Sequence, residues 1–211
     1  MNSEIGRIKS REKKIDALMN LAKKHGPETQ SIAEDIAKQF GGYTTPLNYK
    51  SRKSISRKFN SGEITKEVKD SARTTIILPE ENIESALAEL QKNSRFSRLK
   101  RQDDAGSGYK GNIVNLSFGQ GFMTEIQVNT AEMIYAKETV ADAYRILGGK
   151  EYRRIYSQTG MPGGWGHRYY ETTREKNRLS RKGTFDKNGR TKRGSNDSTD
   201  SRAYYSNFKK K

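Results

Sequence analysis

A carboxylate and a guanidinium, Asp70 and Arg73, stand directly before a β-branched segment that predicts a buried strand over 74–78. At the start of a strand these groups suit a Mg²⁺ ion and a phosphate respectively, and they equally suit an exposed ion pair that stabilises little. The chain has no cysteine and two histidines, His25 and His167, which excludes Cys-ligated zinc and multi-histidine metal sites. Oxygen-ligated Mg²⁺ is therefore the metal we expect, if the protein uses one.

A basic segment over 50–58 precedes this pair. If the segment is helical, Lys50, Ser54 and Lys58 project from one face because they are spaced four residues apart. Two ammonium groups with a hydroxyl between them suit a triphosphate, although the pattern alone is more typical of a solvated basic helix.

Polar side chains also alternate along a predicted strand over 123–128. Glu125, Gln127 and Asn129 leave the sheet on one face because the side-chain period of a strand is two residues. Such a row is typical of a site, and a solvent-facing strand has the same pattern.

A glycine-rich segment over 106–111 carries Tyr109 and Lys110 and leads into another predicted strand. The glycines permit a close approach of the backbone, and Tyr109 offers a flat surface on which a base can stack, worth ~1–3 kcal/mol in nucleic-acid systems. A structural hairpin with one aromatic residue is the commoner explanation of such a segment.

Taken in this order, the four segments resemble the synthetase domain of the RelA/SpoT family. The family pattern Lys-x-x-x-Ser-Ile-x-x-Lys matches 50–58, its strand-leading Asp matches Asp70, its Gly-Tyr-Arg/Lys matches 108–110, and its Glu-Ile-Gln-x-x-Thr matches 125–130. The resemblance covers about 50–147, and the last motif is its most specific part.

This resemblance implies Mg²⁺-dependent transfer of pyrophosphate from ATP to a nucleotide hydroxyl, without a covalent enzyme intermediate. Asp70 and Glu125 are then the catalytic residues and the metal ligands, with Glu125 also drawing the proton from the acceptor. The implied ATP-binding residues are Lys50, Ser54, Lys58 and Arg73. The implied acceptor-binding residues are Tyr109, Lys110, Gln127 and Asn129.

The sequence departs from the family pattern at three places. The arginine that the housekeeping enzymes carry five residues after the Asp is Thr75 here, so we expect Arg73 to contact phosphate rather than adenine. No histidine follows Gly-Tyr-Lys, and Asn129 replaces the arginine that often follows Glu-Ile-Gln. The last two changes lie on the acceptor side, so the resemblance does not imply specificity for guanine. The acceptors known within the family, adenosine nucleotides, guanosine nucleotides and the 3′ end of tRNA, all stay open.

The compact, basic character of the chain is similar to the toxin branch of the family. This similarity implies a growth-inhibiting toxin with an antitoxin or immunity protein as partner, and a cytoplasmic site of action that a secreted toxin domain would reach by delivery. Two other readings compete: an inactive RNA-binding module and a nucleotidyltransferase that moves AMP. The first has no use for Asp70 and Glu125, and the second usually shows an Asp-x-Asp pair that is absent here.

Apolar periodicity and turn residues predict the elements that position these residues. We expect a helix that ends at His25-Gly26-Pro27, a second that ends at Gly41-Gly42, a helix over 50–59, strands over 74–78, 96–99, 112–118 and 123–128, and helices over 80–91 and 131–147. The order predicts an α+β fold, a small mixed sheet flanked by helices, which the resemblance makes nucleotidyltransferase-like.

The domain organisation follows from composition. We expect an N-terminal helical segment over 1–42, a synthetase core over 43–150, an extension with a glycine-rich loop over 151–180, and a flexible basic tail over 181–211. The formal net charge is +16, and 171–211 hold 13 Lys or Arg against 5 Asp or Glu, so half of the surplus lies there. Polyanions are the expected partners. No apolar stretch is long enough to span a bilayer.

Overall fold

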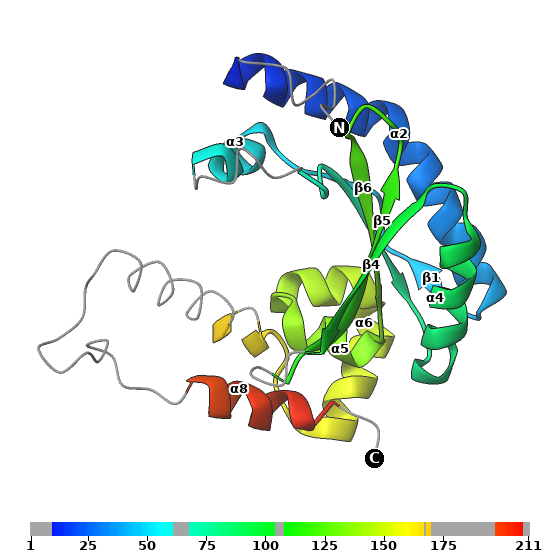
Figure 1. Ribbon diagram of the computed structural model, residues 1–211. Helices are drawn as coiled ribbons and strands as arrows, with labels where there is room; N and C mark the ends of the chain where they lie inside the picture. Colours follow the sequence, from blue (N-terminus) through cyan, green and yellow to red (C-terminus); the bar gives the residue numbers. More distant parts are fainter. Residues whose placement is uncertain (1–9, 61–67, 104–107, 167, 170–196, 209–211) are drawn as a thin grey trace, which may run out of the picture. The chain divides into compact units, whose positions relative to one another are not determined.

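A computed structural model describes residues 10–60, 68–103, 108–166, 168–169 and 197–208 (Figure 1). Two compact units make up the chain. Unit 1 comprises 1–101 and 111–130, and unit 2 comprises 102–110 and 131–211. The division into the predicted segments 1–42, 43–150, 151–180 and 181–211 stays a prediction. A helix within 1–42, α2, packs in the same core as strands within 43–150.

Unit 1 is built on a mixed six-stranded sheet. The strands are β1 (Tyr43–Thr44), β2 (Asn48–Tyr49), β3 (Ala72–Ile77), β4 (Phe96–Asp103), β5 (Lys110–Ser117) and β6 (Met123–Asn129), in the order β1-β3-β6-β5-β4 with β2 beside β3. β3 and β6 are parallel, whereas β1 and β2 pair with β3 and β5 pairs with β6 in antiparallel fashion. The prediction of an α+β fold with a small mixed sheet is confirmed.

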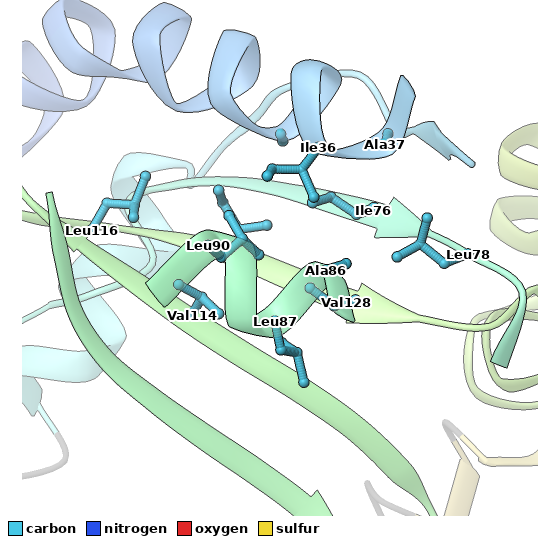
Figure 2. Packing of buried hydrophobic residues seen from close by; sticks show 12 residues of the cluster. Ile36, Ala37, Ile76, Leu78, Ala86, Leu87, Leu90, Val114, Leu116 and Val128 are labelled. Atoms are coloured by element: carbon cyan, nitrogen blue, oxygen red, sulfur yellow. The ribbon is translucent and has the colours of Figure 1, made fainter. Parts of the chain in front are cut away.

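Two helices cover one face of this sheet: α2 (Arg11–Gln39) and α4 (Ile83–Lys92), the latter preceded by a short 3₁₀ turn, η2 (Glu80–Asn82). Figure 2 shows side chains from both helices meeting alternate residues of the strands. The strand residues in this core are Ile76, Val114, Leu116, Ile126 and Val128, all fully buried. Because side chains alternate along a strand, the intervening residues of β5 and β6 face the other side of the sheet.

A second apolar cluster fixes helix α3 (Arg52–Asn60). Ile55 and Phe59, one turn apart, are buried with the N-terminal half of α2, with Val68 and with Ala72 at the start of β3. This packing places the polar side of α3 near the chain that enters β3.

The predicted break between two N-terminal helices is wrong, because α2 runs through Pro27 without ending. Gly26 is buried inside the helix, where an added Cβ would lie 2.9 Å from Leu47 Cδ2, so the glycine permits close packing rather than ending the helix. Thr29 Oγ1 donates to the His25 carbonyl oxygen at 3.1 Å. Burial of the following turns against the sheet outweighs the ~3 kcal/mol that an interior proline costs.

The predicted helix over 50–59 begins later than expected. Ile55 N donates to Ser51 O at 3.0 Å, and Ser54 N donates to Ser51 Oγ at 3.3 Å, so Ser51 is the N-cap of α3. Lys50 therefore lies before the helix. The predicted alignment of Lys50, Ser54 and Lys58 along one helical face is wrong for Lys50.

Unit 2 contains α5 (Ala131–Lys137), α6 (Val140–Thr159) and α8 (Asp197–Ser206). The predicted single helix over 131–147 is wrong. Thr139 Oγ1 accepts from Asp142 N at 3.2 Å and caps α6 as a new helix. Gly148, with φ 74° and ψ 158°, kinks α6 where we expected an end, and Gly160 in the left-handed region ends it instead.

Helix α8 forms at Asp197–Ser206, within the segment that we expected to be flexible. Tyr204, Tyr205 and Phe208 are buried on one side of this segment. Three aromatic side chains within five residues supply an apolar packing face. The tail as a whole is so polar that its composition did not predict this face. The other parts of the predicted tail, 181–196 and 209–211, lie outside the described residues.

Candidate active site

The site in unit 1 begins with Asp70, which precedes β3. Its two carboxylate oxygens accept hydrogen bonds from two lysines: Lys50 Nζ on Oδ2, and Lys58 Nζ on Oδ1 at 2.8 Å. The Asp70 side chain is 16% exposed. Burial alone would raise the pKa of Asp70, but the hydrogen bonds and charges of the two lysines outweigh burial and lower this pKa overall.

Different elements bring the two lysines to one carboxylate. Lys50 follows β2, and its backbone N–H donates to Ser71 O at 2.9 Å, which fixes Lys50 beside the start of β3. Lys58 comes from α3, held by the cluster around Ile55. Two ammonium groups around one carboxylate leave a local net charge of +1, which suits a phosphate chain.

Ser54 makes its hydrogen bonds with Ser51 and Arg57, at the N-terminal end of α3. Its Oγ accepts from Ser51 Oγ at 3.1 Å and from Arg57 Nη2 at 3.3 Å. Ser54 is half-buried and lies one turn before Lys58 on α3. Its predicted contact with ATP stays a prediction.

The parallel pair β3–β6 places Arg73 directly beside Glu125 in register, with Thr75 beside Gln127. On the other side of β6, Asn115 of β5 is the register partner of Glu125. These residues share the sheet face opposite α2 and α4. Sequence reasoning missed Asn115 and Thr75 as site residues because a register between strands cannot be read from one strand.

The polar row on β6 is buried rather than solvent-facing. Glu125 and Gln127 are each 8% exposed and Asn129 is 2% exposed. Gln127 Nε2 donates to Glu125 Oε1 at 2.8 Å, and Asn115 Nδ2 donates to Thr124 O at 3.2 Å. A buried carboxylate oriented by a neighbouring amide is a typical arrangement for a general base.

The two carboxylates predicted to hold a metal, Asp70 and Glu125, both lie in unit 1. Over the part of the chain that the structure describes, no group of three or more His, Cys, Asp or Glu could hold a metal ion. Mg²⁺ does not need such a group, because it keeps several waters and binds one or two carboxylates together with substrate phosphates. Carboxylates are the chemistry that Mg²⁺ prefers, and the role of Asp70 and Glu125 as its ligands stays a prediction.

The remaining predicted residues, Tyr109 and Lys110, lie in unit 2 where the chain enters β5. Tyr109 is half-buried and Lys110 is exposed. The Tyr109 ring contacts the Tyr205 ring at 5.7 Å, and Lys137 Nζ lies 5.2 Å from the Tyr109 ring centroid. Sequence reasoning missed Tyr205 and Lys137, whose separation from Tyr109 along the chain gives no signal.

No helix within the described ranges combines the length and apolar character required to cross a membrane.

Comparison with known proteins places this geometry in context. No protein-family model matches the sequence. Over 152 residues, 70% of this chain, the sequence is 37% identical to the (p)ppApp synthetase toxin Tas1 of Pseudomonas aeruginosa (strain UCBPP-PA14). The chain spans about a third of the length of that curated relative, 34%.

Solved structures extend the comparison. The crystal structure of the complex between the Type VI effector Tas1 and its immunity protein matches with a TM-score of 0.76 at 31% identity, over 93% of this chain and 96% of that one. A GTP pyrophosphokinase family protein from Streptococcus pneumoniae gives a TM-score of 0.48 at 16% identity, over 79% of this chain and 89% of that one.

Proposed function

Because this chain belongs to the RelA/SpoT-type nucleotide pyrophosphokinase family, in the toxin branch with Tas1, we propose that it transfers pyrophosphate from ATP to a hydroxyl of a nucleotide. The observation that carries the proposal is the cluster of Asp70 with two lysines, together with the β3–β6 register that places the buried Glu125 next to Arg73. A cationic cluster and a buried base are the two parts that this chemistry requires.

The proposed reaction exchanges one bond at the β-phosphorus of ATP for another. The acceptor oxygen forms a bond to the β-phosphorus of ATP, the bond from this phosphorus to the α-phosphate oxygen breaks, and AMP leaves. Glu125 takes the proton of the acceptor hydroxyl. Gln127, which donates to Glu125 Oε1, holds this carboxylate in place.

Charge neutralisation falls to the basic residues. Lys50, Lys58 and Arg73 bind the triphosphate, and Ser54 adds a hydroxyl. Both oxygens of Asp70 accept from lysines in this structure, so the triphosphate competes with Asp70 for these ammonium groups. Asp70 and Glu125 would hold Mg²⁺, which supplies further positive charge to the phosphates.

The residues proposed for the acceptor are Gln127 and Asn129 of unit 1, and Tyr109 and Lys110 of unit 2. Tyr109 stacks on the acceptor base, and Lys110 contributes positive charge. A free adenosine or guanosine nucleotide is our first choice of acceptor. The (p)ppApp synthetase activity of the relative supports adenosine nucleotides.

The 3′ end of tRNA is the second candidate acceptor. The excess of basic residues over 171–211 favours it, because a basic segment binds the phosphates of a nucleic acid. A catalytically inactive RNA-binding module is disfavoured by Asp70 and the buried Glu125, because acidic groups weaken the binding of a polyanion.

A direct assay tests the proposal and identifies the acceptor. ATP labelled at the γ-phosphorus is incubated with Mg²⁺ and, separately, with AMP, ADP, ATP, GDP, GTP and bulk tRNA. We expect label in one class of acceptor and, with every acceptor other than AMP itself, an equal amount of AMP, because the β–γ pair moves as a unit. Label in no acceptor, or label in an acceptor other than AMP without release of AMP, would exclude pyrophosphate transfer.

We propose further that the protein acts as a growth-inhibiting toxin in the cytoplasm, where ATP is available, after delivery as a toxin domain. An immunity protein is the expected partner, since the related effector forms a complex with one. Expression in bacteria should halt growth, and Glu125→Gln should abolish this effect. Equal toxicity of the variant would separate toxicity from the proposed chemistry.

A further inference from the structure

We propose that helix α8 holds Tyr109 in place for the acceptor, and that Tyr205 is the positioning residue. This inference rests on the proposed function, in which Tyr109 stacks on the acceptor base. All of the contacts that carry it lie within unit 2.

The first contact is between the two rings. The Tyr109 and Tyr205 ring centroids are 5.7 Å apart with an interplanar angle of 62°, an edge-to-face arrangement. Aromatic pairs favour this geometry because the positive edge of one ring meets the negative face of the other. The Tyr205 ring therefore restricts the orientation of Tyr109.

The backbone beside Tyr109 is also fixed by α8. Gly108 has a φ of +79°, and a Cβ added there would lie 3.1 Å from Arg202 Cα and 3.2 Å from Tyr205 Cβ. Only glycine combines this conformation with such a close approach. The segment that carries Tyr109 thus packs directly on the backbone of α8.

Helix α8 is itself firmly anchored. Tyr205 is 3% exposed, and its hydroxyl occupies the space where a Cβ on Gly166 would lie, 2.0 Å away. Tyr204 Oη lies within hydrogen-bonding distance of the carbonyl oxygens of Pro162, at 2.9 Å, and Ala136, at 3.2 Å. Figure 1 shows α8 near α5, the helix that contains Ala136.

Lys137 of α5 is the second partner of Tyr109. Ala136, which accepts from Tyr204, directly precedes Lys137, whose Nζ lies 5.2 Å from the Tyr109 ring centroid. The ammonium group and the Tyr205 ring therefore contact Tyr109 from elements that are tied to each other. A ring held in this way loses little freedom when a base stacks on it.

Two substitutions at one position test the role of the ring. Tyr205→Leu removes the aromatic edge but still fills apolar space, and we expect it to raise KM for the acceptor about tenfold. KM for ATP should change by less than about twofold, because the proposed ATP site lies in unit 1. Tyr205→Phe keeps the ring and should retain an acceptor KM close to that of the wild type.

Phe208→Leu is the matched control. It removes another buried ring near the end of α8, one that contacts Tyr135 and Tyr204. We expect it to lower Tm as Tyr205→Leu does, with an unchanged acceptor KM. If both Leu variants raise the acceptor KM equally, or if neither does, Tyr205 has no positioning role.

A second route avoids the buried aromatic residues. Gly108→Ala pushes the Tyr109 segment away from α8 through the backbone, so it should also raise the acceptor KM even if Tyr205→Leu does not fold. The acceptor that the labelling assay identifies serves in all assays. With an active wild type, a normal acceptor KM in Gly108→Ala and in a folded Tyr205→Leu overturns this inference alone. A wild type that is inactive with every nucleotide and with tRNA overturns the proposed function and the inference with it.

Discussion

Asp70 holds two lysine ammonium groups close together in unit 1. Lys50 and Lys58 approach its two oxygens from different elements, and their effect on the pKa of Asp70 outweighs that of burial, so the carboxylate stays ionised at neutral pH. The cluster brings two cations together before a substrate is bound. A triphosphate would then find these charges already in place.

Replacing one of these lysines should weaken ATP binding. Lys58→Met keeps the length of the side chain but removes the charge that lies 2.8 Å from Asp70 Oδ1, and we expect KM for ATP to rise about tenfold. Lys92→Met removes a lysine that pairs with Glu89 in an exposed ion pair and is the matched control. Equal KM values for ATP in both variants would exclude the proposed role of Lys58.

The environment of His25 predicts that the stability of the folded chain depends on pH. Its ring stacks on Phe118 at 4.6 Å. Burial, and then the charges of Lys24 and Arg95 against that of Glu28, lower the pKa of His25 below its ordinary value of 6.5. The unfolded chain therefore takes up a proton at higher pH than the folded chain does.

The free energy of unfolding should consequently fall as the pH drops through 6.5, the ordinary pKa of histidine. We expect urea titrations to show a lower free energy of unfolding at about pH 5.5 than at about pH 7.5. His25→Phe keeps a ring against Phe118 but cannot take up a proton, so the free energy of unfolding of this variant should fall less between the two pH values. The same loss in both proteins would show that His25 does not contribute to it.

At the scale of elements, the sequence predicted best those whose side chains alternate strongly. β5 and β6 match their predicted bounds closely because Val114, Leu116, Ile126 and Val128 repeat every second residue on the core face. β4 runs to Asp103, beyond the predicted 96–99, in a stretch rich in charge. Pairing with a neighbouring strand can extend a strand where composition gives no sign of it.

Helix ends were predicted less well because local signals compete with packing. Pro27 is an ordinary stop signal, yet the buried side of α2 carries the helix past it. Ser51 is an ordinary N-cap, and applying the capping rule there would have placed Lys50 outside α3. In the candidate site, the polar row of β6 was therefore predictable, but its partners on β3 and β5 required the register.

The junction between α2 and β1 offers a test of the packing in unit 1. A Cβ on Gly42 would lie 2.2 Å from the Ile77 carbonyl oxygen, so Gly42→Ala must displace backbone at the β1–β3 pair. We expect a loss of about 3 kcal/mol, as for an overpacked core site. Thermal unfolding measures it.

Gly41→Ala is the control for this prediction. The neighbouring Gly41 has a φ of +70°, and a Cβ there would meet nothing within 4 Å. It should cost only the strain of a left-handed residue, about 1–2 kcal/mol. A Tm of Gly42→Ala at or above that of Gly41→Ala would contradict the described packing.

For the whole molecule, charge distinguishes the two classes of acceptor. The net charge of +16 attracts any polyanion, but a tRNA contacts many more phosphates than a free nucleotide does. With a free nucleotide, we expect kcat/KM for the acceptor to fall no more than about tenfold between about 50 and 200 mM salt, whereas six phosphate contacts would cost about a thousandfold. A steep fall together with label in tRNA would favour tRNA as the acceptor.

The central claim is that Asp70 and Glu125 sustain pyrophosphate transfer. The most direct measurement is the kcat for release of AMP in the presence of an acceptor nucleotide, for the wild type, Asp70→Asn and Glu125→Gln, with Glu84→Gln as a control for loss of an exposed carboxylate paired with Arg101. We predict that kcat falls at least about a hundredfold in the two site variants and stays near the wild-type value in the control, while all four proteins unfold cooperatively. Activity close to the wild type in either site variant would contradict the account.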